Sequence, residues 1–311
     1  MRRVQADLDR CDSLVNMVLG QSINPGEGRQ LGWDLASLLG RARMDAGMNS
    51  EAREAFEYLR QTSLNALGEA ESEGALTMQV LSLLALSNIE LETGHIDRSL
   101  ALEVSAVNIS RRYNRSAFLV THLDRLASIR FRMGDRAGAD AADIERARAC
   151  VTVFVTPVPE NDEPSIVWLL ETQASRNCES GFENVRAHFE QSVEALEREV
   201  RQGAPRIADL ADELLFLAQA LGSVPDPAAA RAALRRSVQL RQQHPEAFNG
   251  RSGINLTPYA LAKLAGYSGE QENWTALRRW LVAHQAGGSL TADEVRLLSL
   301  AEAHTGAGGP R

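Results

Sequence analysis

The side chains that could do chemistry, histidines and acidic residues first of all, are scattered along this chain. None of its six histidines lies in an HExxH or HxxxH arrangement, which would place two metal ligands on one face of a helix. Asp209, Asp212 and Glu213 could chelate magnesium from one helical turn, but their Leu and Ala neighbours predict the solvated face of an amphipathic helix. The motifs GxxxxGK(S/T), GxGxxG after a strand, and GxSxG do not occur. We therefore expect no catalytic residues, no metal and no cofactor.

Lysine, tryptophan and cysteine usage narrows the chemistry further. Lys263 is the only lysine, which all but excludes a Schiff-base or phosphate-binding lysine elsewhere. Trp274 shares a helical face with two leucines and is predicted to belong to the core rather than to a ligand platform. Cys11, Cys150 and Cys178 are widely spaced and form no CxxC pair. The sequence thus indicates neither a disulfide framework nor a zinc site, and it fits a reducing compartment.

Composition favours a soluble all-α protein. Of the 311 residues 44% are apolar and 24% charged, which permits a sizeable core, whereas only 5% are aromatic. A core rich in Leu and Ala suits close packing of helices on helices. The formal net charge of -8 argues against nucleic-acid or anionic-membrane partners and favours basic ones. The basic N-terminus precedes acidic residues rather than an apolar run, and no window approaches the roughly 18 apolar residues of a membrane span, so we expect a cytoplasmic protein without a signal peptide.

Apolar periodicity predicts helical hairpins in the first half. Apolar residues step by three and four along residues 31–42 and again along 52–59, as on one face of a helix. Gly47 opens the short polar segment between them, and a glycine that ends one helix just before a polar residue opens the next is typical of a helical hairpin. The pattern returns twice, in 75–93 closed by Gly94 and followed by 96–113, and in 116–133 closed by Gly134 and followed by 135–150.

The second half follows the same plan less regularly. Residues 182–200 predict a long amphipathic helix. Thr291 and Glu294 predict a capping box at the start of the last helix. Three prolines are predicted to occupy first helical positions, namely Pro205, Pro227 and Pro258.

Residues 151–163 do not fit the helical interpretation. Alternating β-branched residues followed by Pro157 and Pro159 predict an extended connector, although the segment could instead pair with another chain as a lone strand. The predicted organisation is an N-terminal helical array in 1–150, a connector in 151–163, a C-terminal helical array in 164–305 and a tail in 306–311.

The closing glycines Gly47, Gly94 and Gly134 recur at intervals of 47 and 40 residues, which indicates a repeat architecture. Aligned on them, small residues recur five positions later and in Leu-small pairs seven to eight positions earlier: Leu39-Gly40, Leu86-Ser87, Leu126-Ala127, Ala52, Ser99 and Ala139. With Phe56 and Ala106, these positions resemble the tetratricopeptide-repeat family, in the lengthened repeats of bacterial signalling proteins, and residues 214–245 look like a further copy. HEAT or armadillo repeats, with periods of about 40 to 47 residues, are the structural alternative.

This resemblance implies an αα-superhelix, a right-handed solenoid of antiparallel helix pairs. It also implies that the first helix of each pair lines a concave groove, which suits an extended peptide or a helix of a partner. The departures are Arg43 and Glu90, which stand where the family commonly has Tyr. The groove residues that the resemblance implies are Arg41, Leu84, Asn88, Leu91, Asp124, Ser128, Phe131 and Arg132.

Three functions are open at this point. The first is a non-catalytic adaptor or scaffold that binds another protein or a peptide in the groove. The second is a regulatory peptide receptor that signals through a change of superhelical pitch. The third is an enzyme on a helical-repeat scaffold, which would need a deep cavity with clustered ionisable groups of shifted pKa.

Overall fold

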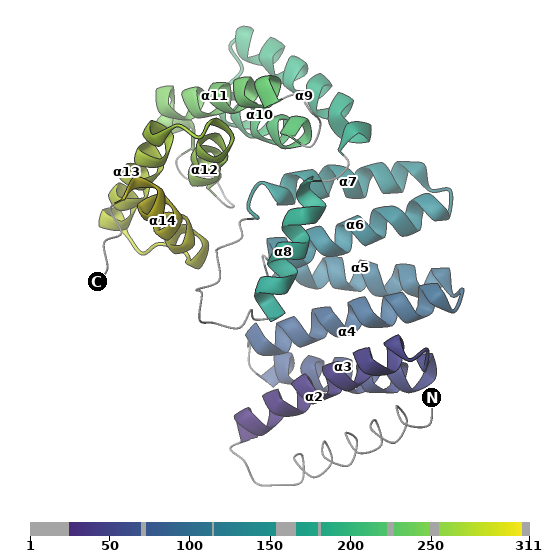
Figure 1. Cartoon of the computed structure of the whole chain (residues 1–311). Coiled ribbons are helices and arrows are strands. Elements are labelled where there is room, and N and C mark those ends of the chain that lie inside the picture. The colour runs from purple at the N-terminus through teal and green to yellow at the C-terminus, as the bar shows by residue number, and fades with distance from the viewer. Residues whose placement is uncertain are drawn as a thin grey trace. The chain divides into compact units, whose positions relative to one another are not determined.

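The fold is all-α, as the sequence predicts. The structure is a computed structural model that describes residues 25–69, 73–113, 115–153, 166–179, 182–222, 227–248 and 255–306. These residues form 13 α-helices, labelled α2 to α14, and one short 3-10 helix, η1 (Figure 1). Helices that follow one another in sequence pack side by side as antiparallel pairs within each of two compact units, residues 1–139 and 140–311.

The first unit is built of three successive helical hairpins, each formed by a first helix and the helix that follows it. It consists of α2 (Pro25–Asp45), α3 (Asn49–Glu69), α4 (Glu73–Glu92), α5 (Ile96–Arg112) and α6 (Ser116–Arg132), and it ends within α7 (Arg136–Cys150). The division falls before the connector predicted at 151–163. Residues 154–163 lie outside the described part of the chain, so the domain boundaries predicted from the sequence stay a prediction.

The second unit continues with shorter and more varied helices. They are α8 (Ile166–Glu179), α9 (Glu183–Arg201), α10 (Ile207–Gly222), α11 (Pro227–Gln243), η1 (Pro245–Phe248), α12 (Thr257–Ser268), α13 (Gln271–Gly287) and α14 (Ala292–Thr305). Pro227 begins α11 and the Thr291–Glu294 capping box is present, both as predicted. Pro205 lies before α10 begins, and Pro258 is the second residue of α12, so these two predicted starts were misplaced by one or two residues.

The predicted glycine-closed turns are confirmed at all three positions. Gly47, Gly94 and Gly134 have φ angles of 74, 81 and 83°, which a residue with a side chain adopts only under strain. Each turn closes with the same backbone pattern; at Gly94, the His95 N–H donates to Glu90 O at 2.7 Å. This bond satisfies a carbonyl that the helix end would otherwise leave unpaired, and it redirects the chain into the next helix.

Small residues allow the helices of each pair to approach closely, as predicted. The Ser87 and Ser99 hydroxyl oxygens lie 2.8 Å apart between α4 and α5, and both residues are fully buried. At Gly40 a Cβ atom would lie 2.7 Å from the ring of Phe56. Ala52 is likewise completely buried. A larger side chain at these hairpin contacts would therefore displace a neighbouring side chain or helix.

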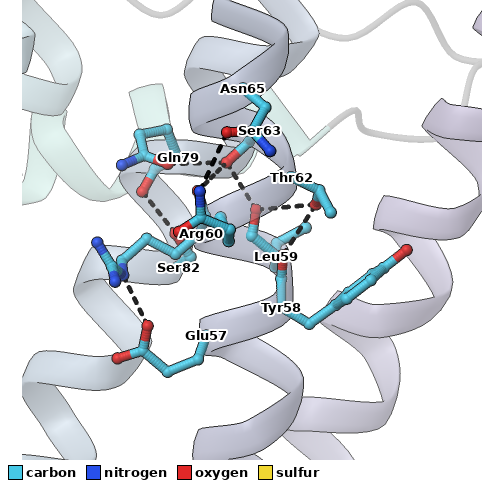
Figure 2. A network of polar contacts seen from close by, with 10 residues as sticks. Glu57, Tyr58, Leu59, Arg60, Thr62, Ser63, Asn65, Gln79 and Ser82 are labelled. Carbon is cyan, nitrogen blue, oxygen red and sulfur yellow. Dashed lines mark hydrogen bonds and ion pairs between the residues drawn. The ribbon is translucent and has the colours of Figure 1, made fainter.

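Helix α4 is the core helix of the first unit. Among the described helices it alone has the length and hydropathy of a membrane span, over residues 74–92, but 67% of that window is buried inside the unit. It packs between α3 and α5. Figure 2 shows how its polar groups are accommodated: the Ser63 hydroxyl on α3 lies 2.8 Å from the Gln79 side-chain oxygen on α4, and both residues are buried. The high hydropathy of α4 is thus explained by its neighbours.

The structure corrects the expectation that the cysteines form no disulfide. Cys150 at the end of α7 is bonded to Cys178 on α8, with a Cα–Cα distance of 5.5 Å. The bond joins residues 28 positions apart, across a segment that separates two helices. Cysteine spacing alone does not show which distant side chains meet. The cysteine pattern consequently no longer supports a reducing compartment.

Candidate functional site

The predicted groove residues all retain solvent access on the first helices of the hairpins, α2, α4 and α6. Leu84, Asn88, Leu91 and Asp124 are half-buried. Arg41, Ser128, Phe131 and Arg132 are exposed. Hairpin geometry explains this pattern, because each of these helices buries one side against its neighbours and leaves the other open.

Phe131 is the most exposed large apolar side chain of the described residues, with 61% of its surface accessible. It lies in the last turn of α6, next to the exposed Arg132. The guanidinium of Arg136 lies 5.8 Å from the centre of the Phe131 ring, a cation–π distance. The Phe131 ring is therefore an exposed apolar surface in contact with a cationic side chain.

Asn88, a predicted site residue of α4, is held by Arg125 of α6, a residue that was not among those predicted from the sequence. Arg125 on α6 donates from Nη2 to the Oδ1 atom of Asn88 on α4. Its Nε donates to Oε1 of Glu103 on α5 at 2.7 Å. Asn88 is therefore part of a polar network across three helices rather than an isolated surface amide. Arg41 on α2 is held differently, by hydrogen bonds to Ser37 on its own helix at 3.3 and 3.4 Å.

At the centre of this network lies a buried acid–imidazole pair. The Nδ1 atom of His122 is 2.6 Å from Oε2 of Glu103, and both side chains are fully buried. Burial acts to raise the pKa of Glu103. The hydrogen bond and charge of His122, the charge of Arg125 and a hydrogen bond from Ser87 act in the opposite direction and outweigh it. The pKa of Glu103 is therefore lowered. Glu103 is consequently a carboxylate, an acceptor only, and His122 Nδ1 must be the donor.

A signal for this network was present in the sequence. Glu103 lies in the inward stripe of α5 between Ser99 and Ala106, where every other position is small or apolar, and His122 and Arg125 are three residues apart on α6. A charged residue in a core stripe requires a partner. Nothing in the local pattern shows that the partner lies 19 residues further along.

The acidic cluster considered for magnesium is engaged in ion pairs with arginines. Asp209 pairs with Arg206 at 2.5 Å, and Glu213 with Arg148 at 2.8 Å. Asp212 pairs with Arg241. Across the described ranges, no group of three His, Cys, Asp or Glu side chains is placed to hold a metal ion.

The glycine-closed hairpins, the small residues at helix contacts and the all-helical units define an all-α helical-repeat protein, whose hairpins resemble tetratricopeptide repeats. No family model matches the sequence, and no curated protein matches it. Among solved structures, BtubC (BKLC) from P. vanneervenii is similar, with 14% sequence identity and a TM-score of 0.41, over 81% of this chain and 94% of that chain. Because this identity and this TM-score are both low, we assign the fold class from the helix pairs of this chain and not from the similarity to BtubC.

Proposed function

We propose that this chain is a non-catalytic adaptor or scaffold that binds a peptide or a helix of a partner protein on the open face of α2, α4 and α6. The observation that carries the proposal is the exposure of Phe131 beside Arg132 on the helix that the repeat pattern assigns to the groove. Aromatic and arginine side chains dominate the binding energy of protein interfaces, because they combine a large apolar surface with directed polar contacts.

The candidate face has the mixed character that a bound peptide requires. Leu84 and Leu91 offer apolar contacts on α4, while the half-buried Asn88 lies between them in sequence. A peptide brings apolar side chains that need pockets and a backbone that needs hydrogen-bond partners. Such alternation along one helix supports peptide recognition better than a purely apolar face would.

The buried network supports the proposal by holding the polar part of this face in place. Asn88 is oriented by Arg125, and Arg125 is oriented by Glu103. A side chain that is already fixed loses little rotational freedom when a ligand binds, so more of the interaction energy remains as affinity. We infer that the network orients Asn88 for binding.

The enzyme alternative is less well supported. Glutamate and histidine side chains often act as general acids and bases, and Glu103 and His122 are within hydrogen-bond distance of each other. However, both are completely buried, and a general base must reach the proton that it removes, directly or through one water molecule. A closed cluster between α5 and α6 suits stabilisation of the hairpins rather than turnover.

An affinity-capture experiment with matched variants tests the proposal. Partners are captured on the wild-type chain, on Phe131→Ala and on Tyr58→Ala. Tyr58 is the matched control, because it is also an exposed aromatic residue but lies on α3, outside the candidate face. It is 44% exposed and points away from the α3–α4 polar contacts (Figure 2). We expect partners to be lost on Phe131→Ala and retained on Tyr58→Ala. Retention of every partner on both variants would contradict the assignment of the face.

A further inference from the structure

The second unit contains a cavity that shares no residue with the candidate peptide face, and we propose that it binds a small organic anion with an apolar body and a carboxylate head. The cavity has a volume of about 390 Å³ and is formed by residues of α11, α12 and α13 and by Pro245 at the start of η1. This volume lies within the range of small-molecule sites, roughly 300–1,000 Å³. The proposal goes beyond the proposed function and does not depend on it.

The walls of the cavity are mostly apolar. Val238, Leu261 and Trp280 line it, together with Pro245 and two alanines of α13. The Trp280 indole is stacked against the imidazole of His284, with ring centres 4.9 Å apart and planes within 16°, so its orientation is supported from one side. Trp274, which the sequence assigned to the core, is indeed buried. The tryptophan available to a ligand is therefore Trp280, six residues further along the same helix.

One polar wall of the cavity is rigid and its charge is compensated. The Arg241 side chain is only 2% exposed and is ion-paired with Asp212. Its guanidinium also reaches the Thr257 hydroxyl at 3.4 Å and lies 4.9 Å from the centre of the Phe248 ring. Arg241 therefore shapes the cavity, and its charge is largely neutralised before any ligand arrives.

Arg279 supplies the charge that a ligand would meet. It lines the cavity from α13, is exposed, and forms no ion pair with any other residue that the structure describes. Among the residues that the structure describes, no acidic side chain lines the cavity. An uncompensated guanidinium at the edge of an apolar hollow favours a carboxylate, which it can bind through two parallel hydrogen bonds, over a cation or a neutral head group.

Apolar volume and charge together decide the class of ligand. An inorganic anion would satisfy Arg279 but would leave Val238, Leu261 and Trp280 facing water. A neutral hydrocarbon would fill the walls and leave the guanidinium without a partner. An amphiphilic carboxylate satisfies both conditions, because its body covers the apolar wall while its head reaches Arg279.

Three probes that differ only in the head group test the proposal: octanoate, octylamine and octanol. Binding to the full chain is measured by isothermal titration calorimetry. The variants are Arg279→Gln, Ala283→Leu, which fills the cavity, and the control Arg236→Gln, an exposed arginine of α11 that does not line the cavity. Trp280→Phe, followed by fluorescence, assigns the signal of the bound probe to this site.

We expect saturable binding of octanoate, with affinity at least tenfold above that of octylamine. Arg279→Gln should weaken octanoate binding by about tenfold or more, as for the loss of a hydrogen bond to a charged group. Ala283→Leu should abolish binding, and Arg236→Gln should leave it unchanged. Equal binding of all three probes, or octanoate binding that survives both Arg279→Gln and Ala283→Leu, would overturn the proposal. Absence of octanoate binding would do the same and would leave the cavity as a receptor for a partner's side chain.

Discussion

His122 Nδ1 lies 2.6 Å from Glu103 Oε2 between α5 and α6, where neither side chain has access to solvent. Removing two such groups from water is costly, and only good geometry with further hydrogen bonds offsets the cost. Here Arg125 and Ser87 provide those contacts. The pair therefore fixes the position of α6 against α5, and through Arg125 it also fixes Asn88 on the candidate face.

Replacement of Glu103 by Gln should destabilise the first unit strongly. The substitution keeps the volume but removes the charge that compensates Arg125, and breaking a buried pair costs about 3–5 kcal/mol. We expect about 3 kcal/mol, because Arg125 is partly exposed and recovers some hydration. Urea unfolding followed by circular dichroism measures the change. Glu54→Gln, at an exposed position of α3, is the control and should change the free energy of unfolding by less than about 0.5 kcal/mol.

The same pair predicts how stability depends on pH. The pKa of Glu103 is lowered in the folded chain from its usual value of 4.5. A lowered pKa stabilises the folded state above the unfolded pKa, and this contribution is lost as the pH falls through the folded pKa. The difference in unfolding free energy between wild type and Glu103→Gln should be constant from pH 7 to about 5 and should shrink below about pH 4. A difference that stays the same down to pH 3 would show that the pKa of Glu103 is not lowered in the folded chain.

Asn88→Ala should cost more stability than its partial exposure suggests. The substitution removes the acceptor of Arg125, and hydrogen bonds to charged groups contribute about 1.5–3 kcal/mol. Because Arg125 keeps Glu103 and some contact with water, we expect a loss of about 1 kcal/mol. Arg132→Ala, at an exposed position on α6, should cost no more than about 0.5 kcal/mol. Equal effects of the two substitutions in urea unfolding would mean that Arg125 does not depend on Asn88.

The contrast between Gly94 and Glu103 shows which parts of the fold the sequence could predict. Gly94 ends a helix because glycine readily adopts a positive φ angle, so this helix end can be recognised from a few neighbouring residues. The Thr291 capping box can be recognised in the same way. Glu103 is understood only with His122 and Arg125, which approach it through packing of separate helices. The Cys150–Cys178 bond was missed for the same reason. Local chemistry predicted the glycine-closed turns and the last capping box; contacts between distant helices had to be observed.

The disulfide predicts a specific thiol count. Oxidised protein should present at most one reactive thiol per chain after denaturation, since Cys150 and Cys178 are bonded. Closing a loop of this length contributes about 3.5 kcal/mol in the chain-entropy description. We therefore expect Cys178→Ser to lower the free energy of unfolding of the second unit by about that amount, and reductant to have the same effect on the wild type. Three reactive thiols in oxidised protein, counted with a chromogenic disulfide reagent, would exclude the bond.

The most direct test of the proposed function is the affinity of one isolated partner for a variant of the candidate face. In the triple variant Leu84→Ala, Phe131→Ala and Arg132→Ala, three side chains with solvent access are removed, and the Asn88–Arg125 contact is left intact. Titration calorimetry with the purified partner should show affinity reduced by tenfold or more, since interface aromatics and arginines often contribute about 2 kcal/mol each. Tyr58→Ala should bind as the wild type does. If the triple variant bound its partner with unchanged affinity, the open face of α2, α4 and α6 would not be the binding site.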